Sequence, residues 1–415
     1  MKFVADFHIH SKYSRATSRD MDLESLDKWA KIKGIKVLGT GDFTHPEWLD
    51  NLKTKLEPAE PGLFKLKKED QGTRFILTAE ISCIYSKNNR VRKIHIIVFA
   101  PSFEVVEKIN AQLGWIGNLK SDGRPILGLD AKELAKIVLN SSPECLVIPA
   151  HAWTPWFAIF GSKSGFDSIE ECFEEYSKYI YAIETGLSSD PLMNWRLSAL
   201  DKITLISNSD SHSPQKIGRE ANVFNTEVSY SAITEAIKTK DPSKFLYTIE
   251  FFPEEGKYHF DGHRNCEVKL SPVETKKYGS LCPVCGKPLT IGVLNRVEEL
   301  ADREEGFVPP NKIPFKSLVP LNEIIADVLG LGTAAKDVAR EYDSLIAKLG
   351  SEFNILLDAN ENTLKSATLS EIAEGIIRVR EGKVTKEPGY DGVYGKIKIF
   401  SAEEGKSVVK QKTLF

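Results

Sequence analysis

The sequence predicts an α/β fold, a parallel barrel or sheet whose strands alternate with helices, followed by two smaller parts. Three observations predict it. Short apolar or β-branched runs alternate with amphipathic stretches through roughly the first 210 residues, a cysteine pair with metal-site spacing follows, and the sequence then turns helical. A chain of 415 residues has room for two to three domains. We expect boundaries at 1–250, 251–300 and 301–400, and a flexible tail at 401–415.

Seven short runs are predicted to be strands. They are residues 3–7, 35–39, 75–79, 94–99, 145–149, 179–183 and 203–207. Amphipathic stretches at 23–33, 131–139 and 169–177 lie between them and predict helices.

Composition narrows the classes of protein. The formal charge of −3 excludes a globally basic nucleic-acid-binding protein, so any contact with phosphates must come from local patches or metal ions. No apolar run reaches the roughly 18–20 residues that a membrane span needs, and the chain starts as a strand without a cationic segment. We expect a cytoplasmic protein with no membrane partner.

Polar side chains that can bind metals follow most of the predicted strands. Because the carboxyl ends of parallel strands meet at one mouth of a barrel, these side chains should converge there. His95 is the exception, since it lies near the start of its run. The others are Asp6, His8, His10, Asp42, His45, Glu80, His151, Glu184, Asp210 and His212.

The residue types in this set indicate metal ligation. Imidazoles and carboxylates suit zinc or manganese, and the chain has no nucleophilic Ser or Cys motif. His8 and His10 alternate along an extended strand, so both imidazoles face the same side, and Asp210 and His212 repeat the spacing. The alternative is that single members cap helices or fill the core.

The motifs that carry these residues resemble those of the polymerase-and-histidinol-phosphatase (PHP) superfamily. They are DFHIHSKYS, GTGDFTH, AEIS, KIHIIVF, IPAH and SNSDSH, and they span about residues 1–250. The resemblance implies a distorted seven-stranded (β/α)7 barrel with a trinuclear metal site that hydrolyses phosphoesters. It implies ligand roles for His8, His10, Glu80, His95, His151, Asp210 and His212, with Glu80 bridging two ions.

Two departures from the superfamily pattern affect the third ion. Gly41-Asp42-Phe43 stands where Thr-Asp-His is usual, and His45 follows two places later, so either Asp42 or His45 is the expected ligand. A further histidine that some members carry after the first pair is missing.

The expected chemistry is hydrolysis by metal-activated water. Clustered divalent ions lower the pKa of bound water and neutralise phosphate charge. We expect Asp210 to orient the water, and Asp210, Glu80 and His10 to be the catalytic residues. Zinc, manganese or magnesium could supply the ions.

A second metal site is predicted after the barrel. Cys282 and Cys285 are separated by two residues and followed by glycine, as in a zinc knuckle, and His263 and Cys266 repeat the spacing. We expect a structural zinc ion on these four side chains, with His259 as the alternative fourth ligand. Such a module can hold a small domain together or contact DNA. The remaining cysteines are expected to be buried hydrophobes: Cys83, Cys145 and Cys172.

The helical part contains a candidate DNA contact. An apolar helix, the turn Gly330-Leu331-Gly332 and a second helix expected to start at Thr333 resemble a helix-hairpin-helix, in which backbone N–H groups hold a phosphate. Lys336 would add charge. Plain helix packing is the alternative.

Two other segments suggest partners. Trp153, Trp156 and Phe157 follow His151 and could form a wall for an unstacked base or a loop that covers the mouth. The final residues, with Gln411, Leu414 and Phe415, resemble peptides that dock on DNA sliding clamps; a frayed tail is the alternative.

Taken together, these parts resemble the endonuclease Q family along essentially the whole chain. The most distinctive stretch is DGHRNC…CPVCGKPLTIGVLNRVEELADR. The resemblance implies a nucleoid-associated DNA repair enzyme. It would nick 5′ of uracil, hypoxanthine, xanthine or abasic sites and leave 3′-hydroxyl and 5′-phosphate ends. The alternatives are a small-molecule phosphatase of the histidinol-phosphate type and a non-catalytic DNA- or clamp-binding scaffold.

Overall fold

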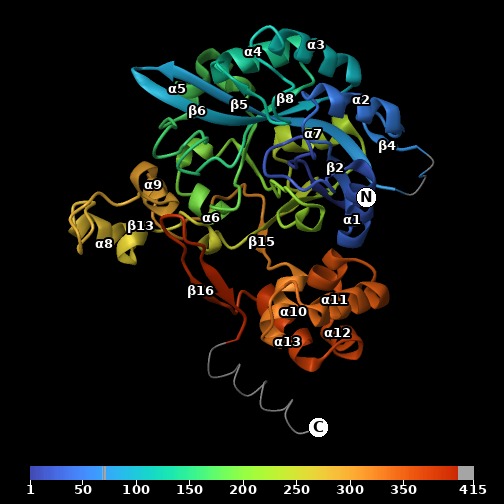
Figure 1. Ribbon diagram of the computed structural model, residues 1–415, viewed down its shortest axis with the longest axis vertical. Helices are drawn as coiled ribbons and strands as arrows, with labels where there is room; N and C mark the ends of the chain where they lie inside the picture. The colour runs from blue at the N-terminus through green and yellow to red at the C-terminus, as the bar shows by residue number, and fades with distance from the viewer. Residues whose placement is uncertain (68, 70–71, 401–415) are drawn as a thin grey trace.

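The structure is a computed structural model, and it describes all residues except 68, 70–71 and 401–415. Its largest feature within the described residues is a mixed sheet of eleven strands in the order β15-β12-β11-β1-β2-β5-β4-β3, with β6 and β7 paired to β5 and β8 paired to β6 (Figure 1). The strands are β1 (Lys2–Asp6), β2 (Ile35–Gly39), β3 (Leu56–Pro58), β4 (Phe64–Leu66), β5 (Arg74–Lys87), β6 (Arg90–Ala100), β7 (Ile126–Leu127), β8 (Leu146–Pro149), β11 (Ala221–Asn225), β12 (Phe245–Glu250) and β15 (Phe315–Ser317).

All seven predicted strands are present, but the expectation of a purely parallel arrangement was wrong. β1, β2 and β5 run parallel, whereas β6 is antiparallel to both β5 and β8. The cause is the two-residue turn at Asn88 and Asn89, which have φ of 55° and 57° and close a hairpin. The reversal also explains His95, because this residue, in the middle of β6, lies beside the carboxyl end of β8, where the Ala150 N–H donates to the His95 carbonyl at 3.0 Å.

Two further strands, β9 (Ala182–Glu184) and β10 (Thr204–Ile206), pair in parallel next to β8 and β1. The Ala152 N–H donates to the Glu184 carbonyl at 2.9 Å, and an isolated bridge joins Ile9 to Ser211. Side chains from β1, β2, β5, β6, β8, β9 and β10 share one apolar cluster in which Phe7 and Phe99 meet at 5.2 Å. These contacts arrange the strands around one shared apolar core.

Helices cover the outside of this sheet (Figure 1). They include α1 (Leu23–Lys33), α2 (Pro46–Lys55), α3 (Phe103–Leu113), α4 (Ala131–Ser141) and α7 (Tyr230–Thr239). The predicted helices at 23–33 and 131–139 are confirmed, and each starts at an aspartate, Asp22 or Asp130, whose carboxylate accepts a first-turn N–H. The third begins as α5 (Ile169–Phe173) and continues as a 3₁₀ helix from Glu174, where φ is 48°.

The remaining chain forms two lobes beside the sheet (Figure 1). A small module contains β13 (Asp261–His263), β14 (Val268–Leu270), α8 (Pro272–Lys277) and α9 (Val293–Leu300). A helical lobe contains α10 (Leu321–Leu329), α11 (Lys336–Leu349), α12 (Glu361–Ala367) and α13 (Ser370–Arg380). α11 starts three residues later than expected, because Gly332 and Ala335 close a tight turn.

The hairpin of β16 (Thr385–Glu387) and β17 (Lys396–Lys398) returns from the helical lobe to the main body, where the Gly389 N–H donates to the Glu254 carbonyl at 2.8 Å. None of the helices in the described residues is long and apolar enough to cross a membrane.

Candidate metal centre

Six of the predicted ligands meet in two overlapping clusters at the mouth of the strands. In the first, His8, His10, Glu80 and Asp210 each offer a ligand atom, and these atoms lie within 4.8 Å of one another. In the second, Glu80 meets His95 and His151 in the same way. Glu80 belongs to both clusters, as a carboxylate that bridges two ions must.

A second layer of carboxylates orients the first histidine pair. His8 Nδ1 lies 3.1 Å from both oxygens of Glu184, and His10 Nδ1 lies 3.1 Å from Asp42 Oδ1. The opposite nitrogens, the two Nε2 atoms, face Glu80 Oε2 at 3.5 and 3.2 Å. His8 Nε2 is buried without a hydrogen-bond partner among the described residues. A histidine held by a carboxylate on one nitrogen and free on the other is the usual arrangement of a metal ligand.

The second cluster is built on Glu80 Oε1. His95 Nδ1 lies 2.7 Å from this oxygen and His151 Nε2 lies 3.1 Å from it. Burial lowers the pKa of His95 to about 4 despite the neighbouring Glu80 carboxylate. His95 is therefore a neutral imidazole at physiological pH, the form that binds a metal ion.

The first cluster has the opposite electrostatics. Although burial opposes protonation, the carboxylates of Glu184, Glu80 and Asp210 raise the pKa of His8 well above its ordinary value. Burial likewise opposes ionisation of Glu80, but His95, Arg124 and His8 hold its pKa well below the ordinary range. In the absence of a cation, protonated histidines thus balance the buried carboxylates, and metal ions would displace those protons.

Three site residues occupy the left-handed backbone region just after a strand. Asp42, His151 and Asp210 have φ of 49°, 29° and 46°. Such conformations cost about 1–3 kcal/mol each in non-glycine residues and cluster at functional sites. The strain turns each side chain from the strand end into the mouth.

Three residues predicted as ligands lie beside the clusters. Asp42 Oδ2 accepts hydrogen bonds from Ser11 N, Ser11 Oγ and Ser14 Oγ at 2.6, 2.7 and 2.9 Å, so this carboxylate stands behind His10. His45 precedes the first turn of α2 and stacks on Tyr13 at 4.5 Å. His212 packs against His10 at 4.4 Å, and its Nδ1 lies 3.0 Å from the Asp210 carbonyl oxygen.

Sequence reasoning missed two contributors to this site. Glu184 was noted at a strand end, but nothing indicated that it would hold His8. Arg124, whose Nη1 lies 2.9 Å from Glu80 Oε2, gave no signal, because it comes from a loop outside the motifs.

The predicted second metal site also comes together. His263, Cys266, Cys282 and Cys285 place their ligand atoms within 4.8 Å of one another, with Cys285 Sγ 3.5 Å from His263 Nδ1. Although desolvation opposes ionisation of the Cys282 thiol, the N–H groups of Cys285 and Val284 lower its pKa to about 7.

The other cysteine and histidine candidates lie outside this group. His259 is buried and stacks on Phe260. Cys83, Cys145 and Cys172 are buried, as expected.

The candidate DNA-binding residues have different environments. Trp153 is buried, and its indole donates to Asn194 Oδ1 at 2.8 Å, so it faces the interior. Trp156 is 37% exposed and meets Tyr258 edge-on at 5.6 Å, whereas Phe157 packs on His95 at 4.6 Å. Of the three aromatic side chains, Trp156 is the most exposed to solvent.

In the helical lobe, Gly330 ends α10 in the left-handed conformation with φ of 65°. Gly332 and Lys336 are exposed, and α11 starts at Lys336 without a side-chain cap. Gln411, Leu414 and Phe415 lie outside the described residues.

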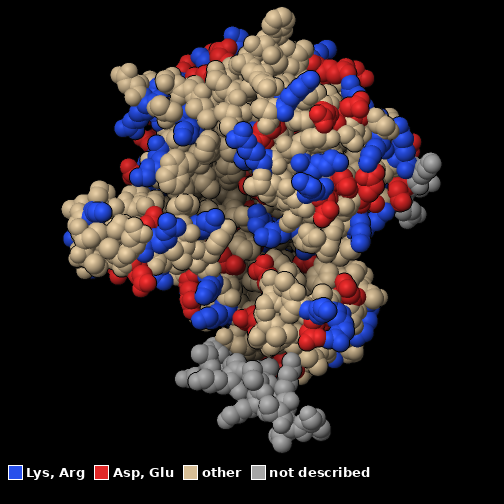
Figure 2. Space-filling view, in the orientation of Figure 1, with Lys and Arg blue, Asp and Glu red and all other residues tan. Residues whose placement is uncertain are grey.

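Basic side chains line the edge of the hollow between the main body and the helical lobe (Figure 2). A cavity of about 480 Å³ at this junction is lined by Lys33, Lys216 and Arg219 from the sheet side and by Asn322 and Glu323 from α10. The lining of this cavity thus contains three basic side chains from the main body, together with the carboxyl groups of Glu255 and Glu323.

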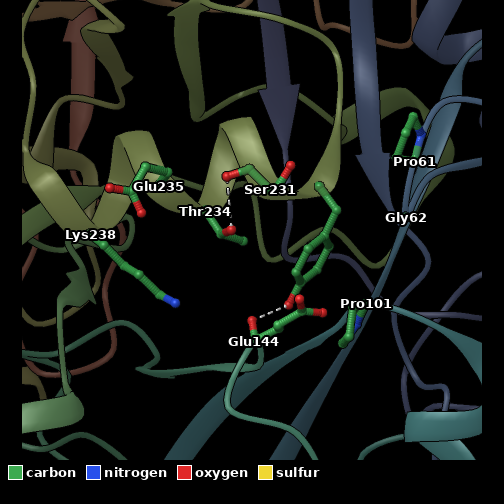
Figure 3. Close-up of a pocket in the computed structure, with 9 residues that line it drawn as sticks. Pro61, Gly62, Pro101, Glu144, Ser231, Thr234, Glu235 and Lys238 are labelled. Atoms are coloured by element: carbon green, nitrogen blue, oxygen red, sulfur yellow. Dashed lines mark hydrogen bonds between the residues drawn. The ribbon is translucent and has the colours of Figure 1, made fainter.

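Another pocket, of about 400 Å³, lies at the opposite end of the strands (Figure 3). Its lining includes Pro101 after β6, Glu144 before β8, and Tyr230, whose hydroxyl donates to the Glu144 carbonyl at 2.9 Å. Glu144 and Pro101 lie at the amino end of β8 and the carboxyl end of the antiparallel β6, whereas His151 follows the other end of β8. The pocket contains no histidine or cysteine and is not part of the metal centre.

Comparison with other proteins finds similar proteins that cover nearly the whole chain. Residues 320–383 match the family model of the MJ0043 C-terminal domain. MJ0043 of Methanocaldococcus jannaschii is 34% identical over 255 residues, which make up 60% of this chain and 31% of that protein. This chain therefore spans about a third of the length of MJ0043. YqxK of Bacillus subtilis is 29% identical over 420 residues, covering 96% of this chain and 99% of YqxK.

Two crystal structures match from end to end. The lesion-specific endonuclease PfuEndoQ from Pyrococcus furiosus has a TM-score of 0.86 and 32% identity, covering 98% of this chain and 99% of that chain. A complex of endonuclease Q with a 27-mer duplex substrate, which carries an abasic lesion at the active site, has a TM-score of 0.85 and 32% identity, covering 98% of both chains.

Proposed function

The chain belongs to the endonuclease Q family, and from this premise we propose that it is a metal-dependent DNA repair endonuclease. It hydrolyses the phosphodiester 5′ of deaminated bases (uracil, hypoxanthine, xanthine) or abasic sites. The observation that carries the proposal is the Glu80-centred ligand set in a chain that matches, over 98% of its length, a structure with an abasic duplex at the active site. The protein acts on DNA in the cytoplasm, at the nucleoid.

The ligand set fits two or more divalent cations. His8, His10 and Asp210 would hold one cation, His95 and His151 would hold a second, and Glu80 would contact both. Such cations lower the pKa of a nearby water and neutralise the charge of the phosphate. Zinc suits the histidine-rich set, and manganese or magnesium are alternatives.

The chain's own residues orient the reaction. Asp210, whose pKa lies below its ordinary value, is ionised and 27% exposed, so its carboxylate can accept a hydrogen bond from the attacking water and orient it. The water oxygen forms a bond to phosphorus while the bond from phosphorus to the 3′ oxygen breaks. The 3′ oxygen takes up one proton in place of the one that the water gives up, which leaves 3′-hydroxyl and 5′-phosphate ends.

We further propose that the strands form a distorted seven-stranded barrel of the PHP type. Its seven strands would be β1, β2, β5, β6, β8, β9 and β10. The isolated bridge between Ile9 and Ser211 supports closure of the barrel between the first and the last of these strands. Residues 1–250 then form the barrel, 251–300 the zinc module, 301–400 the helical domain and 401–415 the tail. β15 is an exception, since it extends the barrel sheet through β12.

The zinc module is proposed to be structural. His263, Cys266, Cys282 and Cys285 offer the Cys₃His donor set of a closed tetrahedral zinc site. The hydrophobic cluster beside them is small, with Val268, Leu270, Cys282 and Leu289 as its buried members. A bound ion would replace the core that this module lacks.

DNA lies across the metal mouth in this proposal. Trp156 is the candidate for stacking with an unpaired base, and Phe157 supports His95 rather than the base. In the helical lobe, the exposed turn with Gly330, Gly332 and Lys336 is the candidate for a phosphate contact. The clamp remains a proposed partner through Gln411, Leu414 and Phe415. A peptide of the last residues should bind a cognate sliding clamp and lose binding on Phe415→Ala; no measurable binding would remove this partner.

One assay separates the candidate functions. A labelled duplex with a single deoxyuridine, deoxyinosine or abasic site is incubated with the protein and Mg²⁺, Mn²⁺ or Zn²⁺, beside an undamaged duplex. A nick immediately 5′ of the lesion supports the proposal. Hydrolysis confined to histidinol phosphate would show a small-molecule phosphatase, and a mobility shift without cutting would show a binding scaffold.

A further inference from the structure

Arg124 places its guanidinium directly against the metal clusters. Its Nη1 lies 2.9 Å from Glu80 Oε2, the oxygen that also faces His8 and His10 at 3.5 and 3.2 Å. The same guanidinium interacts electrostatically with Asp210. A positive side chain thus lies in direct contact with Glu80, the carboxylate that both clusters share.

The loop that carries Arg124 is fixed from both sides. Both backbone groups of Gly123 are hydrogen-bonded, and the Pro125 carbonyl accepts from the Ser82 N–H at 3.0 Å. A Cβ on Gly123 would lie 2.2 Å from Asp42 Oδ2, so glycine is required for this backbone to pass against the carboxylate. The loop therefore positions Arg124 at the metal centre.

The guanidinium has spare donors. It carries five N–H groups, and within the described residues the contact with Glu80 is its one hydrogen bond. The side chain is 26% exposed, whereas Glu80 is fully buried, so its free edge faces the mouth rather than the core. The planar guanidinium can donate two parallel hydrogen bonds to the oxygens of a phosphate that lies beside the candidate metal ligands.

From this geometry we propose that Arg124 is a catalytic residue that binds a non-bridging oxygen of the scissile phosphate. The inference rests on the proposed function and deepens it. With cations bound at Glu80, Arg124 would lose its carboxylate partner, and the substrate phosphate would take the place of that carboxylate. The guanidinium then stabilises the negative charge that builds on the equatorial oxygens as water attacks and the 3′ oxygen leaves.

The test compares Arg124→Ala and Arg124→Lys with the wild type. The matched control is Arg90→Ala, which removes the same charge from an exposed position at the tip of the β5–β6 hairpin. Each protein is loaded with Mn²⁺, its metal content is measured, and inorganic phosphate is titrated by calorimetry. Single-turnover cleavage of an abasic duplex is then followed with each protein.

Arg124→Ala should keep the wild-type metal content and bind inorganic phosphate about tenfold or more weakly. Cleavage should slow by about 10²–10³-fold, the usual cost of removing one donor to a developing oxyanion. Arg124→Lys should recover phosphate affinity better than cleavage, because lysine supplies charge without the fork. Arg90→Ala should match the wild type in every measurement.

Two results would overturn the proposal. One is unchanged phosphate affinity in Arg124→Ala. The other is a loss of bound metal that accounts for the loss of activity, which would make Arg124 a positioning residue for Glu80. If the wild-type protein cuts no lesion, the proposed function is refuted. The role of Arg124 in phosphate binding is still decided by the phosphate titration, so the two failures can be told apart.

Discussion

The substitution Asp42→Asn should weaken metal binding without removing an ion. Asp42 is fully buried and accepts from Ser11 and Ser14 with Oδ2, while Oδ1 faces His10 Nδ1 at 3.1 Å. Asparagine has one acceptor oxygen. If that oxygen keeps the serine bonds, the amide NH₂ faces His10 Nδ1 and favours the tautomer with its proton on Nε2. Nε2 is the atom that must be free to bind the ion.

The size of the loss in metal affinity follows from the contact between the asparagine NH₂ group and His10 Nδ1. Loss of a carboxylate behind a ligating histidine typically costs 10–100-fold in metal affinity, which is about 1.4–2.7 kcal/mol. Restoring the ligand tautomer would leave two buried donors facing each other, at a cost of about 1–3 kcal/mol. The two estimates agree, so we expect a dissociation constant 10–100 times larger.

The assay is competition between the protein and a fluorescent chelator, with stoichiometry measured by mass spectrometry at saturating metal. Asp50→Asn, an exposed change of the same charge on α2, is the control. Unchanged affinity in Asp42→Asn would refute the orienting role. If Asp42→Asn lacks a whole ion at saturating metal, Asp42 is a metal ligand. If His45→Ala lacks the ion and Asp42→Asn keeps it, His45 is the ligand of the third ion.

Three further predictions concern the reaction, the zinc module and pH. Asp210→Ala should abolish hydrolysis while the circular-dichroism spectrum and Tm stay near wild type; substantial residual cleavage would contradict the role of Asp210. Cys285→Ser should lower the zinc content by one ion per chain and expose the module to limited proteolysis, whereas Cys172→Ala, a buried cysteine far from that group, should keep the ion. Burial raises the pKa of Glu250 to about 8, and burial beside Glu250 raises the pKa of Glu220 well above its ordinary value. The folded protein then holds protons that the unfolded chain releases above pH 4.5, so the free energy of unfolding should fall as pH rises toward 8, by up to about 1.4 kcal/mol per pH unit per group. Glu220→Gln should make this fall shallower in urea titrations of the metal-free protein at pH 5.5 and 8, and an unchanged slope would show that Glu220 is ionised in the folded state.

The strands were predictable because each is a short apolar run between polar turns. Their directions were not. Asn88-Asn89 reverses the chain between β5 and β6, but two asparagines also occur in ordinary loops, and the expectation of helices between strands favoured a parallel sheet. His95 carried the missing information. It lies near the start of its apolar run, and such a residue can join residues that follow other strands when its own strand runs the other way.

The same contrast separates the ligands from the residues that support them. Candidate ligands such as His8 and His10 are of rare residue types, in spacings that metal chemistry restricts, so their pattern stands out in one sequence. Glu184 and Arg124 are common residue types on the surface of proteins. What makes them functional is a contact across 176 residues of chain in one case and 44 in the other. These contacts depend on how the loops pack. The loop at Gly123, for example, passes against Asp42 only because glycine has no side chain, and a sequence pattern of reactive residues does not reveal this.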